Sequence, residues 1–315
     1  MLNSIVQALL PVAFVVFLGW LAAALKALKR EHAGILATLV VDFALPCSLF
    51  GGVMKLSASQ LTNIPYFLAM FIGLMGIYFL GLFLGVFVFR NTLGESALEG
   101  AVGAFPSMAY SGLPVLNAIV GPAGILAVLV GNLVTSIFMV PTTLVLLEVS
   151  ASNNQTKGNG GTLELILTKV VSAVKQPVVW LPVTGFILAL CGLKLPHVLD
   201  SSFDLIGQAA AGVALFALGL MLFGQKFKLD LQIGTNVLLK NVGQVILMFL
   251  LVLAFGIKGN SGKELILTGA IPSATAVSMF AVKYGLYTER TSATTLISTV
   301  LSVVTIGLTI ALVNG

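Results

Sequence analysis

The chain has 315 residues, of which 58% are hydrophobic and only 9% are charged, and its mean hydropathy is +1.09. A soluble domain is excluded, because its surface would need about a quarter of the residues to be charged. The net charge of +5 requires no nucleic-acid partner, since basic residues retained in cytoplasmic loops account for it. We therefore predict an all-α polytopic membrane protein.

Hydropathy predicts ten membrane-spanning helices, because about 20 consecutive apolar residues cross a bilayer. The first is expected to remain in the mature chain, since residues 1–7 lack the basic segment of a cleavable signal peptide. In chain order the predicted spans are 5–25, 33–53, 65–89, 97–121, 123–147, 176–190, 203–223, 236–256, 265–283 and 292–313.

The segment 150–162 separates the fifth predicted span from the sixth. It is rich in Asn and Gly and lacks apolar periodicity, so it is expected to be a flexible cytoplasmic linker. The flanking repeats, 1–149 and 163–315, each hold five predicted spans. A repeat with an odd number of crossings enters the membrane from the opposite face the second time, so we predict inverted repeats.

A short motif stands near the middle of both the fourth and the ninth predicted span. Gly103-Ala104-Phe105-Pro106-Ser107 returns as Gly269-Ala270-Ile271-Pro272-Ser273. A proline at mid-span removes a backbone donor and leaves carbonyls that other groups must satisfy. Paired interruptions in two inverted halves indicate the binding site of a transporter. We predict that the two helices break and cross at these prolines.

The ends of two restarted helices would form an anion site. Their first N–H groups have no partner within the helix and carry the positive end of its dipole, and nearby hydroxyls favour a carboxylate. The predicted substrate-binding residues are Pro106, Ser107, Tyr110, Ser111, Asn117, Pro272, Ser273 and Thr275. Alternatively, the hydroxyls bond their own helices and the prolines only kink them. The fourth span has a second candidate break at Pro114, which would bring Asn117 near the ligand.

Basic residues that flank the predicted spans are unevenly distributed between the two sides. Twelve lie on the side of the loops after spans 1, 3, 5, 7 and 9: Lys26, Lys29, Arg30, Arg90, Lys157, Lys169, Lys175, Lys226, Lys228, Lys240, Lys283 and Arg290. Four lie on the other side: Lys55, Lys194, Lys258 and Lys263. Because retained Lys and Arg mark the cytoplasmic side, we expect a protein of the cytoplasmic membrane with both termini outside.

Polar residues within the spans are candidates for ion coupling, because ionisable groups inside a membrane are usually functional. Asp42 in the second span is the clearest, and the alternative is a structural acid paired with a neighbour or near the aqueous end. Asn132, Asn241 and Gln244 are further candidates, for which hydrogen bonding between helices is an equal alternative. No metal site and no cofactor are predicted.

Four fragments in chain order resemble the auxin efflux carrier family. They are Val41-Asp42-Phe43-Ala44-Leu45-Pro46, Pro106-Ser107 with Gly112-Leu113-Pro114-Val115-Leu116, Val213-Ala214-Leu215-Phe216-Ala217-Leu218-Gly219, and Ala270-Ile271-Pro272 with Phe280-Ala281-Val282-Lys283-Tyr284. The resemblance implies ten helices in the fold of sodium/proton antiporters and bile-acid symporters, with helices 4 and 9 crossing at prolines. It also implies a dimerising scaffold of helices 1, 2, 6 and 7, and a moving elevator of helices 3–5 and 8–10.

The same resemblance implies a role for two serines. Ser107 matches an asparagine that binds the substrate carboxylate in plant members, and Ser273 matches a glutamine there. The shorter serine side chains and the short linker favour a compact bacterial-type carrier, similar to those for malonate and malate, over an auxin exporter.

These patterns together predict a secondary transporter of a small mono- or dicarboxylate that works by an elevator mechanism. The alternatives are an anion channel and a sodium-coupled symporter of a bile-acid-like anion. A proton or a sodium ion is a candidate partner, and a homodimer is expected. No enzymatic activity is predicted, because the spans hold no clusters of His, Asp, Glu or Cys.

Overall fold

The computed structural model describes residues 2–55, 63–153, 168, 171–224 and 230–314. Within these ranges the ordered elements are helices, and one isolated β-bridge is the only strand-like pairing. Most of the predicted linker, together with Lys157, Lys169, Lys226 and Lys228, lies outside the described residues. The predicted all-α class is therefore confirmed for the described part of the chain.

Six of the described helices are long and apolar enough to cross a membrane. They are His32–Met54, Ile64–Val88, Leu126–Ala151, His197–Leu222, Leu231–Ala254 and Thr288–Val313. Two shorter apolar helices, Ala13–Ala24 and Pro177–Leu190, fall in the first and sixth predicted spans. A multi-pass membrane protein is thus confirmed, whereas the number of ten spans and the inverted repeats stay predictions.

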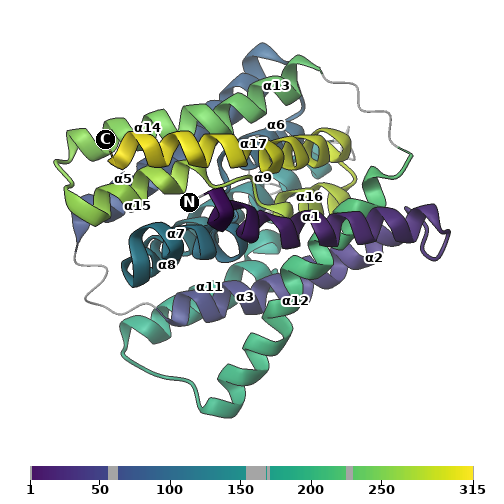
Figure 1. Cartoon of the computed structure of the whole chain (residues 1–315). Helices are drawn as coiled ribbons and strands as arrows, with labels where there is room; N and C mark the ends of the chain where they lie inside the picture. The colour runs from purple at the N-terminus through teal and green to yellow at the C-terminus, as the bar shows by residue number, and fades with distance from the viewer. Residues whose placement is uncertain (1, 56–62, 154–167, 169–170, 225–229, 315) are drawn as a thin grey trace.

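One group of helices packs around the long helix α12 (His197–Leu222). The other members are α1 (Leu2–Ala24), α2 (His32–Leu39), α3 (Leu45–Met54) and α11 (Pro177–Leu190). Helices α1, α2 and α3 contact α12, and α11 contacts α3. Figure 1 shows α3, α11 and α12 together at one edge of the molecule. We call these five helices the α12 group.

A second group packs around α5 (Ile64–Phe83) and α6 (Leu93–Ala104). The other members are α9 (Val140–Asn153), α13 (Leu231–Leu238), α14 (Gln244–Ala254), α15 (Gly259–Ala270) and α17 (Thr288–Asn314). Glycines bring α5 and α6 close together, since a Cβ on Gly81 would lie 2.8 Å from the Cα of Gly100. We call these seven helices the α6 group, and Figure 1 shows them opposite α3, α11 and α12.

Three short helices lie where the two groups meet. They are α7 (Leu113–Val120), α8 (Ile125–Val134) and α16 (Thr275–Tyr284). Helix α8 contacts α3 as well as α5, and α16 contacts α2 and α12 as well as α6 and α17. These helices therefore make many of the contacts between the two groups.

Five single π-helical turns occur in the described part of the chain. They are Val40–Ala44 (η1), Leu84–Val88 (η2), Met108–Gly112 (η3), Thr135–Met139 (η5) and Leu239–Gly243 (η6). Such turns are uncommon and concentrate at functional sites. Asp42, Ser111 and Asn241, which the sequence marked as candidates, each lie in one of these turns.

The placement of Lys240 corrects one step of the orientation argument. The sequence counted this lysine with the cytoplasmic loops, but it lies inside the candidate span Leu231–Ala254 and is 0% exposed. That helix begins earlier than the predicted residue 236, so the lysine lies within it rather than at its end. Eleven basic residues against four still favour the same orientation, which stays a prediction.

Candidate functional site

The helical backbone is interrupted at the two copies of the repeated motif. Helix α6 ends at Ala104 and helical structure resumes at Met108, while α15 ends at Ala270 and α16 begins at Thr275. Both interruptions contain the proline of the motif. The backbone of Phe105 is extended, with φ −75° and ψ 106°, and Ile271 is similar, with φ −63° and ψ 135°.

The two interrupted segments pair directly with each other. The Ser107 N–H donates to the Pro272 carbonyl over 2.9 Å, and the Ala274 N–H donates to the Phe105 carbonyl, also over 2.9 Å. These bonds form the antiparallel bridge between Pro106 and Ser273. Segments 166 residues apart in the chain therefore cross in contact, and we call this contact the crossing.

Pro114 does not mark an interruption. Gly112 has helical torsion angles, with φ −69° and ψ −50°, so α7 continues from the preceding π-helical turn and holds Pro114 in its first turn. Asn117 is exposed on α7 and is not among the residues that line the cavities described below. The side chain of Tyr110 lies outside the described residues.

The carbonyl ends of the two broken helices are capped by buried side chains. Gln244 Nε2 donates to the carbonyl of Ala104 at the end of α6 over 2.8 Å. Lys240 Nζ donates to Gln244 Oε1, and lies 3.5 Å from the carbonyl of Gly269 near the end of α15. Both side chains are fully buried, so one lysine and one glutamine serve the C-terminal ends of α6 and α15.

Ser273 also caps α6, which differs from the role that the sequence suggested. Its hydroxyl donates to the carbonyl of Val102 over 2.8 Å, and its N–H donates to the hydroxyl of Ser298 over 3.1 Å. The hydroxyl proton of this serine is therefore engaged within the protein.

The amide ends on the other side of the crossing are not capped in this way. The residues that precede the restarted helices, Ser107 and Ala274, make no side-chain capping bond. The first N–H groups of a helix have no partner within it and carry partial positive charge. These amide ends are thus suited to interact with a bound anion.

Two small cavities adjoin the amide ends. The larger, of about 50 Å³, is lined by Ser107, Asn132 and Thr275, and by Ser48 and alanines of the α12 group. The smaller, of about 10 Å³, adjoins Ser107, Ser111, Ser273, Thr275 and Thr299. Among the described residues, no charged side chain lines either cavity. Any positive potential there therefore arises from backbone amides and from more distant groups.

A wider cavity of about 370 Å³ lies between α3, α8 and α12. It shares Ser48 and Asn132 with the cavity of about 50 Å³. Lys55 and Asp204 also line it and form an exposed ion pair at 3.4 Å. The crossing therefore adjoins a larger space at the C-terminal end of α3.

Polar contacts also join the α12 group to helices outside it. Asp42 lies in the π-helical turn between α2 and α3, midway along the candidate span His32–Met54, and pairs with Lys283 at the end of α16. Gln176, which precedes α11, donates to the Tyr284 hydroxyl over 2.8 Å and to Glu148 Oε1 of α9 over 3.3 Å. Asp42 is therefore an acid paired with a neighbour, which is the alternative to ion coupling that the sequence left open.

Of the three other ion-coupling candidates, Asn132 lines the cavities of about 50 and 370 Å³, whereas Asn241 and Gln244 make structural contacts. Asn241 Nδ2 donates to the carbonyl of Ser298 over 3.1 Å and to the hydroxyl of Thr305 over 3.4 Å, which ties α14 and its π-helical turn to α17. Gln244 caps α6 as described. Neither arrangement resembles an exposed ion-binding group.

Sequence reasoning missed Lys240 and Glu99 as candidate functional residues. Glu99 is a fully buried carboxylate on α6. A signal for Lys240 was present, because Gln244 follows it by four residues and the two lie on one face of a helix. Glu99 had no comparable local signal, since its neighbours come from other parts of the chain.

Comparison with known proteins gives one family and several relatives. A family model described as membrane transport protein matches residues 4–310. An uncharacterized transporter, YfdV, of Escherichia coli strain K12 is 29% identical over 309 residues, which cover 97% of this chain and 96% of YfdV. A putative malonate transporter of Rhizobium meliloti strain 1021 is 29% identical over 303 residues, which cover 94% of this chain and 92% of that protein.

Proposed function

The chain belongs to the membrane transport protein family, and on that premise we propose that it is a secondary carrier of a small organic anion bound at the crossing. The resemblance to auxin efflux carriers is confirmed by the family match. One observation carries the proposal: side chains cap the carbonyl ends at the crossing, whereas the amide ends of the restarted helices face cavities without such a cap.

The substrate class follows from the size and chemistry of the site. Ser107 and Thr275 place hydroxyl groups beside the amide ends, where they can donate to a carboxylate. The cavity of about 50 Å³ favours a compact ligand, and a relative named as a putative malonate transporter agrees with this. We therefore propose a small mono- or dicarboxylate, with malonate as the first probe.

We further propose that transport follows an elevator mechanism. The α12 group corresponds to the predicted scaffold, helices 1, 2, 6 and 7, and the rest of the chain to the moving helices 3–5 and 8–10. The Asp42–Lys283 pair joins the two parts midway along the span His32–Met54, while the cavity of about 370 Å³ lies between them near Lys55, at the C-terminal end of that span. This asymmetry supports a state that is open on the non-cytoplasmic side.

The remaining features of the proposal come from the sequence. They are two inverted five-helix repeats in the cytoplasmic membrane, both termini outside, and a homodimer formed through the scaffold. An anion channel is less well supported, because an ion pair bridges the boundary between the two parts. A bile-acid-like substrate is disfavoured by the small cavity.

Uptake of radiolabelled malonate into proteoliposomes tests the function. We expect uptake that saturates, that is competed by other small carboxylates and that is impaired in Ser107→Ala. The matched control is Ser202→Ala, since Ser202 is exposed on α12 and bonds only its own helix, at Val198. If liposomes with and without the protein took up malonate and each of the other small carboxylates equally, the proposal would be contradicted.

A disulfide lock tests the elevator in a background without Cys47 and Cys191. Asp42→Cys with Lys283→Cys should form a cross-link that stops uptake until it is reduced, because it joins the two parts. Lys55→Cys with Asp204→Cys joins two positions of the α12 group and should leave uptake intact. Full uptake with the first cross-link in place would argue against relative movement there.

A further inference from the structure

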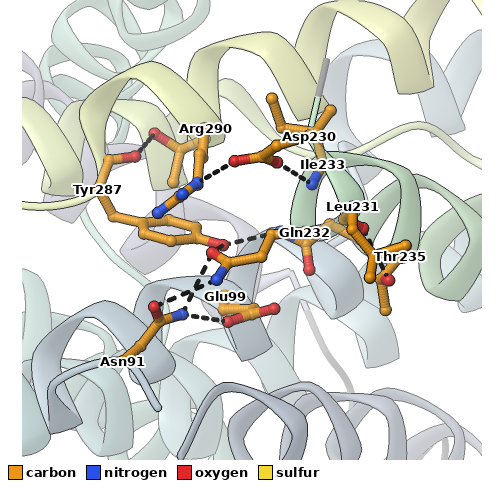
Figure 2. A network of polar contacts seen from close by, with 11 residues as sticks. Asn91, Glu99, Asp230, Leu231, Gln232, Ile233, Thr235, Tyr287 and Arg290 are labelled. Atoms are coloured by element: carbon orange, nitrogen blue, oxygen red, sulfur yellow. Dashed lines mark hydrogen bonds and ion pairs between the residues drawn. The ribbon is translucent and has the colours of Figure 1, made fainter. Parts of the chain in front are cut away.

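A second buried polar cluster lies away from the crossing, where α6, α13 and α17 contact one another near their N-terminal ends, and Figure 2 shows part of it. It consists of Asn91, Glu99, Gln232, Asn236 and Tyr287, with the ion pair Asp230–Arg290 at its edge. We call it the Glu99 cluster. Glu99, Gln232, Asn236 and Arg290 lie on helices of the α6 group, and Asn91, Asp230 and Tyr287 lie just before α6, α13 and α17.

Glu99 is the central acid of this cluster and is 0% exposed. Its Oε2 accepts a hydrogen bond from Asn91 Nδ2 at 2.8 Å, as Figure 2 shows. Its Oε1 has no hydrogen-bond partner among the described residues. Gly85 of the π-helical turn η2 leaves the space for this carboxylate, because a Cβ there would lie 2.8 Å from Oε2.

No cation in the described structure is bonded to Glu99. Arg290 is the nearest basic group in the cluster, and its Nε is paired with Asp230 Oδ2 at 2.6 Å. The other charged groups on helices packed against α6 are engaged elsewhere: Lys240 with Gln244, Lys283 with Asp42, Glu148 with Tyr284 and Gln176, and Glu95 of α6 itself with Thr92. A buried carboxylate without a cation is costly and tends to be neutralised.

A second unpartnered acceptor lies in the same cluster. Asn236 is buried and its Oδ1 has no partner among the described residues, while its Nδ2 donates to the Tyr287 hydroxyl over 3.3 Å. That hydroxyl donates to Gln232 Oε1 over 3.1 Å. Burial raises the pKa of Tyr287 above its ordinary value, so the phenol stays a donor. The cluster therefore holds two acceptor oxygens that lack a donor.

A proton fits the two unpartnered acceptor oxygens of the cluster better than a sodium ion does. A sodium ion would need several free oxygens around it, but the amide nitrogens of Asn91 and Asn236 point donors into the cluster. A proton on Glu99 removes the uncompensated charge and converts one acceptor into a donor.

We propose that Glu99 is the proton-binding group that couples anion transport to the proton gradient, an inference that rests on the proposed function. The carboxylate takes up one proton on one side of the membrane and releases it on the other, and no covalent bond to the substrate changes. Protonation adds one positive charge to the moving helices, which offsets one negative charge of the anion.

An infrared titration of the purified full chain tests proton binding without any substrate. The carbonyl stretch of a protonated carboxylic acid should appear as pH falls, and Glu99→Gln should remove the band that this residue contributes. The matched control is Glu264→Gln, since Glu264 is also buried, lies on α15 and accepts a hydrogen bond from Tyr66 at 3.1 Å. A titrating band that is unchanged in Glu99→Gln would overturn the proposal.

Malonate uptake in proteoliposomes tests the coupling. The ratio of uptake with and without an imposed pH gradient should fall to one in Glu99→Gln, stay as in the wild type in Glu264→Gln, and be partly kept in Glu99→Asp, which retains a carboxyl group. Wild-type uptake that ignores the pH gradient, or that follows a sodium gradient lost in Glu99→Gln, would contradict a proton site. If malonate is not transported at all, the proposed substrate fails, while the infrared titration still decides whether Glu99 binds a proton.

Discussion

At the crossing, the carbonyl ends of two helices and the amide ends of two others have different surroundings. On one side, carbonyls at the ends of α6 and α15 meet Gln244, Lys240 and Ser273. On the other, the amide ends that follow Ser107 and Ala274 have no side-chain cap and adjoin cavities. An unsatisfied backbone group costs several kcal/mol inside a membrane. Side-chain caps on the carbonyl ends and their absence at the amide ends support our proposal that the amide ends meet a bound anion.

The charge at the crossing reinforces this difference. The C-terminal end of a helix carries about half a negative charge, and two such ends meet near Lys240. The lysine has no carboxylate among its hydrogen-bond partners in the described structure. The partial negative charges of these two helix ends compensate the positive charge of the lysine, a compensation that Glu99 lacks, and the amide ends then dominate the potential that an anion meets.

The largest effect is expected for Lys240→Met, which keeps the side-chain volume but removes the charge from the carbonyl side. A unit charge about 10 Å from an anion contributes about 1.7 kcal/mol at an effective dielectric constant of about 20, and uncapped helix ends add about 0.3–1 kcal/mol. We expect the Kd for malonate, measured by calorimetry, to rise roughly 30-fold to 100-fold.

The control for this variant is Lys258→Met, because Lys258 is exposed at the start of α15. It should bind malonate as the wild type does. If Lys240→Met also keeps the wild-type Kd while unfolding at the same temperature, Lys240 has no part in balancing the two sides.

Ser107→Ala addresses the amide side and should have the next largest effect. Ser107 lines both small cavities, and a hydrogen bond to a charged group contributes about 1.5–3 kcal/mol. We expect the lower value, about a tenfold rise in the Kd for malonate, because the side chain is only half-buried. An unaltered Kd would mean that the anion does not meet this end of the helix.

The sequence could predict the amide side of this comparison but not the carbonyl side. Proline chemistry and the repeated motif are local, so they place Pro106 and Pro272 and the serines that follow. The caps come from elsewhere in the chain: Gln244 reaches a carbonyl 140 residues earlier, at Ala104. Only the packing of α14 against the broken helices brings these groups together.

The same limit explains the two residues whose roles differ from the sequence-based prediction. Ser273 was predicted to contact substrate, yet its hydroxyl donates to Val102, 171 residues away in the chain. Lys240 was counted with the basic residues that flank the cytoplasmic loops, although it lies within the predicted span 236–256. Burial of a lysine depends on acceptors that no sequence window contains.

Thr275→Pro removes one backbone donor from the amide side without a change in charge. Helix α16 begins at Thr275, and Ala274 before it has φ −74° and ψ 133°, which suits a residue that precedes proline. Proline is tolerated in the first turn of a helix, so the fold should survive. Loss of one hydrogen bond to the charged carboxylate, taken at the lower value of about 1.5 kcal/mol, should raise the Kd for malonate about tenfold, as in Ser107→Ala.

Thr275→Val tests the contribution of the hydroxyl separately from that of the backbone N–H. It keeps the N–H and the approximate shape but lacks the hydroxyl, so its Kd reports the side chain alone. If the valine variant weakens binding as much as the proline variant, the hydroxyl and not the amide end contacts the anion.

Ser273→Ala should have the smallest effect on binding, because this hydroxyl serves the carbonyl side. Its loss leaves the Val102 carbonyl without that donor, which costs about 1 kcal/mol of the free energy of unfolding. We expect a lower unfolding temperature in detergent and a Kd for malonate within about twofold of the wild type. The opposite result, with stability kept and affinity lost, would place Ser273 with Ser107 on the ligand side. The two serines of the repeated motif would then act alike, and the difference between the two sides would rest on Lys240 and Gln244 alone.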